Sequence, residues 1–272
     1  MKNSYQQFYG QTALISGGSS GIGFAVGRQL ANAGANVWLL ARRKENLEKA
    51  LAALPRSAQQ SHGILVGDVA DWEQVNQLMQ QMKQKVGLPD LIINSAGITQ
   101  PGYVQDLSID IFQKMISVNY LGTVYVIKAL LPDLIARASG TIVNISSVAG
   151  FIGVFGYSAY GASKYAVRGF SDVLRAELKP RGIHVSVVFP PDTDTPQLAY
   201  ETPFKPPETR ALSSTGGVLT ADQVAQAILK GIIRRQYIIL PGTETKLLYH
   251  LNNLLGNAIY PLMDWMIRKA RS

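Results

Sequence analysis

Short, continuously apolar runs alternate with helix-length stretches along most of the chain, and this alternation constrains the fold more than any other feature of the sequence. The apolar runs occupy residues 12–16, 36–41, 62–67, 90–94, 140–145 and 183–189. Stretches with helical character lie between them, over residues 21–33, 44–54, 71–86, 109–136 and 157–179. Strands that are apolar throughout are typical of a parallel sheet covered on both faces, whose strands are joined by crossover helices. The sequence therefore predicts a Rossmann-like, doubly wound α/β fold, with a parallel sheet flanked by helices in a single domain.

Composition narrows the classes of function. The 272 residues suit one large α/β domain, and 47% apolar against 16% charged residues provides a core and argues against disorder. The chain contains no cysteine, which excludes disulfides, zinc–thiolate sites and thiol nucleophiles. Its three histidines, His62, His184 and His250, have no metal-ligand spacing, so we expect no metal site. The net charge of +8 comes without Lys and Arg runs interleaved with aromatic residues, so we expect no nucleic-acid partner.

A glycine cluster lies where the first predicted strand meets the first predicted helix. Gly17 allows a tight turn, Gly21 lets the backbone approach a pyrophosphate at the helix start, and Gly23 leaves room for the helix to pack on the sheet. The other turn residues that we expect to contact the cofactor are Ser19, Ser20 and Ile22. Because a strand precedes the cluster and a helix follows it, the cluster predicts a dinucleotide-binding site rather than a merely tight turn.

The end of the second predicted strand indicates which dinucleotide binds. Enzymes that use NAD usually place an acidic residue there to bind the ribose hydroxyls, whereas this chain has Arg42 and Arg43. A guanidinium can bind a 2′-phosphate through charge-assisted hydrogen bonds, and a carboxylate would repel it. We therefore expect NADPH/NADP+ as the cofactor, with Arg42 favoured over Arg43 as the phosphate ligand and with a contribution from the Ser19 hydroxyl. Two solvent-exposed arginines at a helix start are the structural alternative.

Two further strand ends fit the same cofactor. Asp68 and Val69 follow the third predicted strand, where a carboxylate can accept a hydrogen bond from the adenine amino group. Asn94, Ala96 and Gly97 follow the fourth strand, where small residues leave room for the adenosine ribose. Each stretch is also compatible with an ordinary turn at the end of a strand.

Ser147, Tyr160 and Lys164 form the pattern with the most chemical content. Tyr160 and Lys164 are four residues apart on a predicted helix, so both side chains lie on one face. A phenol is a poor acid–base catalyst at neutral pH, but a nearby ammonium and a positive nicotinamide ring both favour its ionised form. Ser147 follows the fifth predicted strand, where its hydroxyl can stabilise an oxyanion developing on a carbonyl substrate. The three residues predict an acid–base site at the carboxyl ends of the strands.

Together these motifs resemble the short-chain dehydrogenase/reductase family over about residues 10–240. The resemblance implies hydride transfer from a nicotinamide to a ketone, with Tyr160 donating the proton and Lys164 also holding the ribose hydroxyls of the cofactor. It implies Ser147 rather than Ser146 as the active serine, because Ser147 precedes Tyr160 by thirteen residues, as in the family.

The resemblance also implies roles for residues that the pattern alone would pass over. Asn119 matches the family asparagine that holds a water in the proton relay. Pro190, Thr193 and Thr195 follow the sixth strand, where the family places residues that face the nicotinamide carboxamide and the pyrophosphate. Family members commonly form dimers or tetramers through the helices after the fourth and fifth strands, so the resemblance implies a homo-oligomer.

Residues 190–219 are rich in Pro, Ser and Thr and are too long for a simple connection, which indicates a substrate loop or lid. Two runs in it, Pro190 to Pro196 and Lys205 to Arg210, resemble the 3-ketodihydrosphingosine reductases, a group within the family that reduces 3-dehydrosphinganine to sphinganine. The resemblance implies a lipid-like ketone as substrate. Another hydrophobic ketone or a 3-oxoacyl thioester is the alternative within the family. A dinucleotide-binding regulator without catalysis is the alternative outside it, and the intact Ser-Tyr-Lys set argues against that function.

A helix over residues 221–234 and a last strand over residues 237–240 complete the predicted order of elements. We therefore expect an NADP-binding reductase domain over residues 1–243, including the substrate loop, and a C-terminal amphipathic extension over residues 244–272.

The C-terminal extension carries leucine, isoleucine and methionine at helical spacing and ends with Arg268, Lys269 and Arg271. The apolar stripe predicts either an interfacial helix with its basic residues near anionic headgroups, as for residues 245–272 at a membrane surface, or a helix that packs on protein. The polar N-terminus has no apolar segment, so we expect no secretory signal. We expect a cytoplasmic protein, which the first alternative would place peripherally on the cytosolic face of a membrane.

Overall fold

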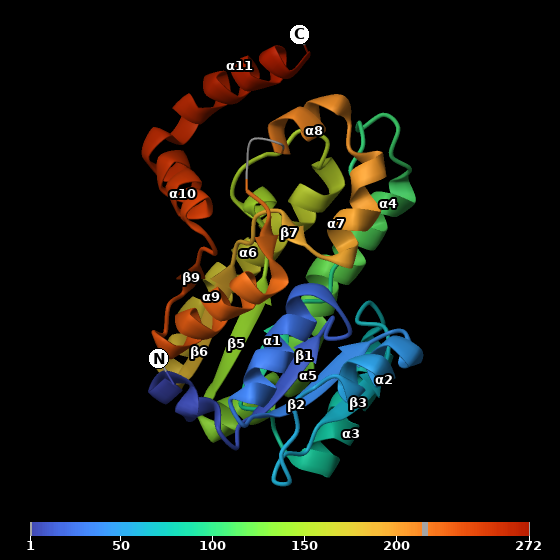
Figure 1. The fold of residues 1–272 in the computed structure, drawn as a ribbon, viewed down its shortest axis with the longest axis vertical. Helices are drawn as coiled ribbons and strands as arrows, with labels where there is room; N and C mark the ends of the chain where they lie inside the picture. The colour runs from blue at the N-terminus through green and yellow to red at the C-terminus, as the bar shows by residue number, and fades with distance from the viewer. Residues whose placement is uncertain (1, 214–216, 272) are drawn as a thin grey trace.

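The computed structural model describes residues 2–213 and 217–271, and at its centre lies a seven-stranded parallel sheet (Figure 1). The strands are β1 (Thr12–Ser16), β2 (Asn36–Ala41), β3 (Gly63–Val66), β4 (Leu91–Asn94), β5 (Gly140–Ile145), β6 (Ile183–Val188) and β9 (Ile238–Ile239). Their order is β3-β2-β1-β4-β5-β6-β9, with parallel pairing between neighbours. The predicted fold is confirmed. The strand order reverses between β1 and β4, which is the point where ligands bind in such sheets.

Helices cover both faces of the sheet. Because alternate residues of a strand point to opposite faces, each strand contributes side chains to both cores. On one side, Ala13 and Ile15 of β1 join the core beneath α1 (Gly21–Asn32), α2 (Lys44–Ala52) and α9 (Ala221–Ile233). On the other side, Leu14 joins the core beneath α3 (Trp72–Val86), α5 (Gly122–Arg137) and α6 (Ser158–Leu178). This burial on both sides accounts for the continuously apolar strands in the sequence.

The helix predicted over residues 109–136 is interrupted by a π-helical turn. Its first part, α4 (Ile109–Met115), is joined to α5 by η2 (Ile116–Leu121), which contains Asn119. Such turns are rare and often lie at functional sites. Among the described residues, Ile109–Arg137 is the one helix whose length and composition would allow it to cross a membrane. The packing of α5 on the sheet accounts for its apolar character.

The predicted substrate loop over residues 190–219 contains more regular structure than its composition indicates. Its described part holds β7 (Thr193–Asp194), α7 (Pro196–Glu201), the 3-10 turn η5 (Thr202–Phe204), α8 (Pro207–Ser213) and β8 (Leu219–Thr220). Both helices begin with a proline, whose fixed φ suits the first helical position. The Thr195 hydroxyl caps α7 by accepting a hydrogen bond from the Leu198 N–H. β7 pairs in parallel with β8, so the two ends of this segment are joined.

The C-terminal extension forms two helices. α10 (Thr243–Leu255) and α11 (Ile259–Arg271) meet at η6 (Gly256–Ala258), where Gly256 has a φ of +50°. Tyr249 and Ile259 are buried with Phe151 and Phe189, so one face of the extension packs on the rest of the protein. The other face leaves large apolar side chains exposed, namely Leu247, Leu254, Tyr260, Trp265 and Met266. α11 lies next to α8 at the end of the molecule (Figure 1). Packing on protein therefore accounts for the inner part of the predicted stripe only.

Candidate active site

Three glycines of the glycine turn, Gly17, Gly21 and Gly23, lie where a side chain would be strained or would meet neighbouring atoms. Gly17 has a φ of +68°, and a Cβ on it would lie 2.6 Å from the backbone nitrogen of Ala96. A Cβ on Gly23 would lie 2.5 Å from the carbonyl oxygen of Gly17, and one on Gly21, at a φ of +56°, would lie 3.2 Å from Cγ2 of Thr195. Within the described residues, no side chain caps the first N–H groups of α1. The turn therefore presents bare backbone donors at a helix start, which fits the pyrophosphate of a dinucleotide.

The predicted adenosine-binding residues lie at the neighbouring ends of β2 and β3. The Arg42 guanidinium is 3.9 Å from the Asp68 carboxylate, and both side chains are partly exposed. Asp68 also accepts a hydrogen bond from the Ala70 N–H at 3.0 Å. Val69 is buried. Arg43, exposed like Arg42, is the residue that precedes α2. The structure thus brings a cationic group and a carboxylate to the edge of the sheet beside the glycine turn.

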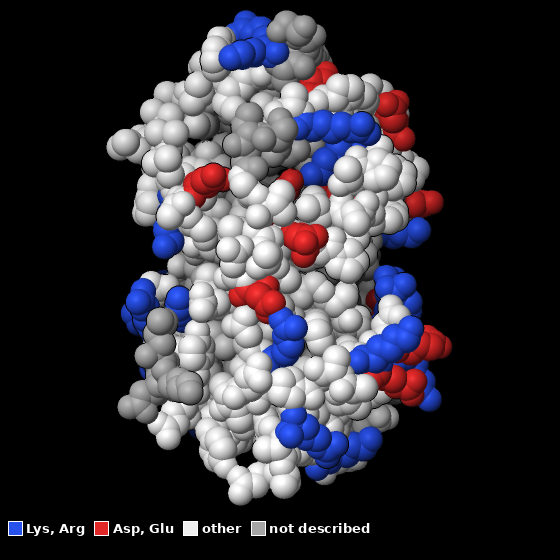
Figure 2. All heavy atoms as spheres, in the orientation of Figure 1, with Lys and Arg blue, Asp and Glu red and all other residues white. Residues whose placement is uncertain are grey.

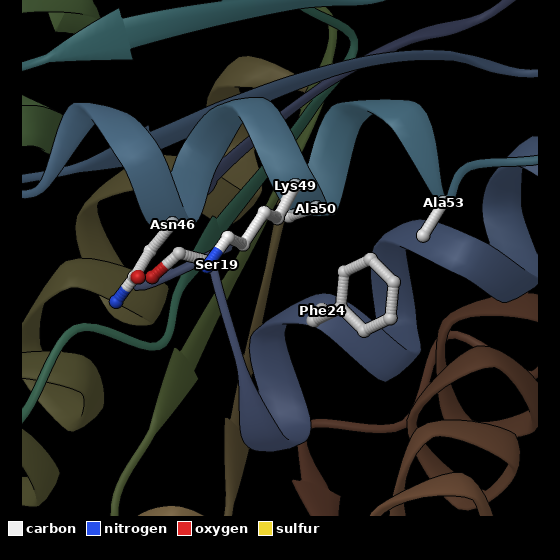
Figure 3. A pocket seen from close by; sticks show the side chains of 6 residues that line it. All are labelled: Ser19, Phe24, Asn46, Lys49, Ala50 and Ala53. Carbon is white, nitrogen blue, oxygen red and sulfur yellow. The ribbon is translucent and has the colours of Figure 1, made fainter.

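A pocket of about 240 Å³ lies between α1 and α2, next to the glycine turn (Figure 3). It is lined by Ser19, Phe24, Asn46, Lys49, Ala50 and Ala53. The polar ends of Ser19, Asn46 and Lys49 point toward one another. Asn46 and Lys49 were not predicted as site residues, although their spacing on α2 places them on one helical face. Together with Arg42, these groups supply positive charge and hydrogen-bond donors beside the glycine turn.

Ser147, Tyr160 and Lys164 meet at the carboxyl ends of β5 and β6. Ser147 and Gln197 of α7 lie close enough to the Tyr160 hydroxyl for their side chains to lower its pKa. The Lys164 Nζ lies 5.6 Å from the centre of the Tyr160 ring and donates a hydrogen bond to the Ile145 carbonyl at 2.9 Å. All three predicted residues are therefore brought together, and a fourth, Gln197, is added by the substrate segment.

The alternative serine, Ser146, points elsewhere. Its buried hydroxyl donates a hydrogen bond to the Lys164 carbonyl oxygen at 2.9 Å, which ties the end of β5 to α6. The Ser147 hydroxyl instead accepts a hydrogen bond from the Ala149 N–H at 3.2 Å and lies beside Tyr160. The geometry thus agrees with the choice of Ser147.

Burial sets the protonation of the two titratable groups. It lowers the pKa of Lys164 to about 8, because an ammonium is poorly solvated in the interior. Burial also raises the pKa of Tyr160, and the negative charges of Glu201 and Asp192 raise it further. The nearby Ser147 side chain opposes this rise. Tyr160 is therefore protonated at neutral pH in this state, as a proton donor must be.

Asn119 holds the backbone that follows β4. Its Oδ1 accepts a hydrogen bond from the Ile98 N–H at 2.8 Å, and its Nδ2 donates to the Ile98 carbonyl at 3.0 Å and to the Ser163 hydroxyl at 2.9 Å. The neighbouring Gly97 is close to Lys164: a Cβ on it would lie 3.5 Å from Nζ. Asn119 therefore fixes the position of the Gly97 backbone beside Lys164.

Asn94 is the predicted cofactor residue whose side chain is directed elsewhere. Its Nδ2 donates a hydrogen bond to Oδ1 of Asn144 on β5 at 2.9 Å, and Asn144 in turn donates to the Ser171 hydroxyl at 2.9 Å. The Asn94 side chain thus links β4 to β5 in the sheet. The Ala96 backbone after it packs against Gly17. Ala96 has the small side chain that was predicted to leave room for the adenosine ribose.

The turn after β6 contacts both the residues that follow Ser147 and the glycine turn. The Pro190 carbonyl accepts a hydrogen bond from the Val148 N–H at 3.0 Å, one residue beyond Ser147. The buried Thr193 donates its hydroxyl to the Pro191 carbonyl at 2.8 Å. Thr195 faces Gly21. The three predicted residues of this turn therefore lie between the catalytic residues and the phosphate-binding turn.

A group of charged side chains lies beside Tyr160 in the substrate segment. Glu201 and Lys205 are almost fully buried. The Lys205 Nζ is 3.0 Å from Oδ2 of Asp192 and 3.3 Å from Oε1 of Glu201. The Tyr157 hydroxyl donates to the same Glu201 oxygen at 2.8 Å, and its ring centre is 5.7 Å from that of Tyr160. We call Asp192, Glu201 and Lys205 the charged cluster; no sequence pattern predicted that Glu201 and Lys205 would be buried beside Asp192.

A second pocket, of about 420 Å³, lies beside the start of α6. Its walls are largely backbone and apolar or aromatic side chains, contributed by Gly102, Tyr103, Val104, Gln105, Phe155, Gly156 and Ser158. Ser158 is the first residue of α6, so this pocket lies at the start of the helix that carries Tyr160 and Lys164.

Residues 11–205 match the family described as short chain dehydrogenase. The chain is 38% identical to a 3-dehydrosphinganine reductase of Danio rerio, over 84% of this chain and 70% of the relative. It is 36% identical to a 3-ketodihydrosphingosine reductase of Bos taurus, over 89% and 74%. Its fold is similar to the solved structure of a short-chain dehydrogenase from Sphingobium yanoikuyae in complex with NADPH, with a TM-score of 0.77, 29% identity, and coverage of 93% of this chain and 95% of that one.

The family match spans well over half of the chain, and it agrees with the glycine turn and the Ser147–Tyr160–Lys164 arrangement. The chain therefore belongs to the short chain dehydrogenase family and is an oxidoreductase that uses a nicotinamide cofactor.

Proposed function

We propose that this protein catalyses the NADPH-dependent reduction of the ketone of 3-dehydrosphinganine to the alcohol of sphinganine. The contact of Ser147 and Tyr160 beside Lys164 carries the reaction type. The named activities of the relatives from Danio rerio and Bos taurus support the substrate.

Each catalytic side chain has a defined role in this reaction. A bound nicotinamide cofactor supplies the hydride that adds to the carbonyl carbon. Ser147 donates a hydrogen bond to the carbonyl oxygen and stabilises the negative charge that develops there. Tyr160 transfers its phenolic proton to that oxygen, which completes the alcohol. The Lys164 ammonium stabilises the resulting phenolate and holds the cofactor ribose.

Access to Tyr160 involves the substrate segment. Gln197 of α7 lies beside the Tyr160 hydroxyl, so a ketone that binds there comes next to the Gln197 side chain. The apolar pocket beside Ser158 can receive part of the hydrocarbon chain. A long apolar substrate is therefore compatible with the surroundings of the site.

The residues beside the glycine turn support NADPH over NADH. Arg42 is exposed, and Ser19, Asn46 and Lys49 line the adjacent pocket. These donors and cations suit a phosphate on the adenosine ribose, and no carboxylate follows β2 directly. The NADPH complex of the Sphingobium yanoikuyae relative is consistent with this proposal.

The outer face of the C-terminal extension supports peripheral contact with the cytosolic face of a membrane. Leu254 and Trp265 are exposed there, and Arg268 and Lys269 follow on α11. Figure 2 shows basic side chains at the end of the molecule that α11 forms. Apolar groups flanked by basic ones suit the boundary between acyl chains and anionic headgroups.

We also propose a homo-oligomer, dimer or tetramer, through α4, α5 and α6, where Ile109 and Val173 are exposed.

One assay tests the activity. NADPH consumption is measured with 3-dehydrosphinganine, with an acetoacetyl thioester and with simple ketones, at equal concentrations. The proposal requires the highest kcat/KM for 3-dehydrosphinganine. A higher value for the thioester would assign the protein to the alternative function, and turnover of none of these ketones would refute ketone reduction.

A second experiment tests the membrane contact. Flotation of the protein with anionic vesicles is compared with that of a Leu254→Ser, Trp265→Ser variant, whose changes lie on the exposed face. We expect the wild type to float and the variant to stay in the bottom fraction. Equal behaviour of the two proteins would contradict membrane contact through this face.

A further inference from the structure

The charged cluster of the substrate segment holds two carboxylates and one ammonium. Asp192 and Glu201 both pair with Lys205, at 3.0 and 3.3 Å. The group therefore carries one excess negative charge, and Glu201 and Lys205 are almost fully buried. A buried carboxylate without a full countercharge is unfavourable in general, so proteins retain one where a cation compensates it.

Fixing the loop does not require the second carboxylate. Asp192 alone would pair with Lys205 and link the turn after β6 to the residue that follows η5, whereas Glu201 and Lys205 lie only four residues apart in the chain. The remaining polar contact of the cluster, from Tyr157 to Glu201, is a hydrogen bond that a neutral amide oxygen would accept equally well. The excess charge therefore calls for an explanation besides loop structure.

The cluster lies beside the reacting hydroxyl. Gln197 and Glu201 are four residues apart on α7 and so lie on one helical face. Gln197 lies beside the Tyr160 hydroxyl, and Glu201 is one turn farther along the same face. Both Glu201 and Asp192 act electrostatically on Tyr160 and raise its pKa. A ligand that binds beside Gln197 at Tyr160 therefore comes next to the two carboxylates.

The cluster is also partly open to a ligand. The Asp192 side chain is 38% exposed, whereas that of Lys205 is 5% exposed. Asp192 binds Lys205 through Oδ2, and no other hydrogen bond to its carboxylate occurs in the described part of the chain. One carboxylate oxygen thus remains for a cation that enters with the substrate.

We propose that Asp192 and Glu201 bind an ammonium group on the carbon next to the ketone of the substrate and so select amino ketones over plain ketones. This inference rests on the proposed function, because 3-dehydrosphinganine carries its amino group at that position. With the carbonyl oxygen between Ser147 and Tyr160, the neighbouring ammonium lies toward α7. Lys205 holds the two carboxylates together, and the ammonium neutralises the charge that Lys205 leaves uncompensated.

The test compares two substrates, 3-dehydrosphinganine and the hydroxy ketone of the same chain length without the amino group. The wild type should prefer the amino ketone in kcat/KM by roughly tenfold or more, as expected for a charge-assisted hydrogen bond. Glu201→Gln and Asp192→Asn each remove the excess charge while leaving Lys205 one carboxylate partner. Each variant should lower that preference to about threefold or less, because the neutral cluster no longer distinguishes the two ketones.

The ratio of the two kcat/KM values is the readout, since any effect of the variants on Tyr160 or on folding is common to both substrates. Asp194→Asn is the matched control: Asp194 is exposed, lies two residues after Asp192 in the same run of the segment, and makes no contact with the cluster in the described residues. Its ratio should equal that of the wild type. Thermal unfolding shows whether Glu201→Gln and Asp192→Asn are folded. If one of them does not fold, the ratio measured for the other decides whether the cluster binds the ammonium.

The outcomes separate the two proposals. A preference that survives in both Glu201→Gln and Asp192→Asn overturns the recognition of the ammonium and leaves the proposed function intact. Equal kcat/KM for the two substrates in the wild type does the same. A wild type that reduces neither compound refutes the proposed function and this inference together.

Discussion

Asn119→Ala should destabilise the protein through the backbone that Asn119 holds. The substitution removes three buried hydrogen bonds, to the N–H and the carbonyl of Ile98 and to the Ser163 hydroxyl. Asn119 is almost fully buried, so water does not easily replace the lost partners. A buried polar group without its partner costs about 1–3 kcal/mol. Because the Ser163 hydroxyl keeps its hydrogen bond to the Tyr160 carbonyl, we expect a total loss of about 3–5 kcal/mol in the free energy of unfolding.

Thermal unfolding measures this effect. For a chain of this size, 1 kcal/mol corresponds to about 2–4 °C, so the Tm should fall by roughly 6–20 °C. Ser163→Ala removes one of the three bonds and should cost about 1–2 kcal/mol. Cofactor binding should weaken as well in Asn119→Ala, because the Gly97 backbone shifts beside Lys164. If the Tm of Asn119→Ala stays within about 2 °C of the wild type while kcat falls, Asn119 acts on the proton transfer itself and the structural role argued here is wrong.

Three further predictions concern the catalytic residues and the cofactor. Tyr160→Phe should lower kcat by at least about 100-fold while NADPH binding, measured by fluorescence titration, is retained; substantial turnover would remove Tyr160 from the mechanism. Arg42→Asp should lower the ratio of kcat/KM for NADPH over NADH by roughly tenfold or more, and Arg43→Asp should change it less; an unaltered ratio in Arg42→Asp contradicts the phosphate assignment. The pKa of Lys164 is lowered to about 8, so its ammonium deprotonates as the pH rises through that value, whereas the raised pKa of Tyr160 keeps the phenol protonated. The kcat for ketone reduction should therefore fall above about pH 8, and a pH profile that stays flat up to pH 10 would show that the Lys164 charge is not needed.

The sheet and the catalytic core were predictable because local sequence determines them. Strands buried on both faces must be apolar throughout, and these runs can be read directly from the sequence. The turn at Gly17, Gly21 and Gly23 excludes side chains, so the glycines themselves mark it. The spacing of Tyr160 and Lys164 fixes their common face as soon as the helix is recognised.

The substrate segment could be predicted only in outline. Its two helices are shorter than eight residues and lack a repeating apolar pattern, so their proline starts and the Thr195 cap were the only local signals. The burial of Glu201 and Lys205 depends on Tyr157 and Asp192, which lie far away or across a turn in the sequence. Charged residues in a polar loop are normally solvated, and tertiary contacts alone place these in the interior.

The direction of individual side chains was also beyond sequence patterns. Asn94 follows the predicted strand correctly, but its amide bonds across the sheet to Asn144 because that partner lies opposite in the register of β4 and β5. Lys49 lies seven residues after Arg42, and it reaches Ser19 only because α2 packs beside the glycine turn. In both cases the deciding neighbour comes from another element.

The pairing of β7 with β8 makes the substrate segment a self-contained insert. Its two ends are held side by side, by the ladder between Thr193 and Leu219 and by the hydrogen bond from the Leu219 N–H to the Asp192 carbonyl. Closing a loop whose ends are already adjacent depends only weakly on its length. Evolution can therefore lengthen, shorten or replace the part in between, and so retune what this scaffold reduces, without disturbing the sheet that binds the nucleotide.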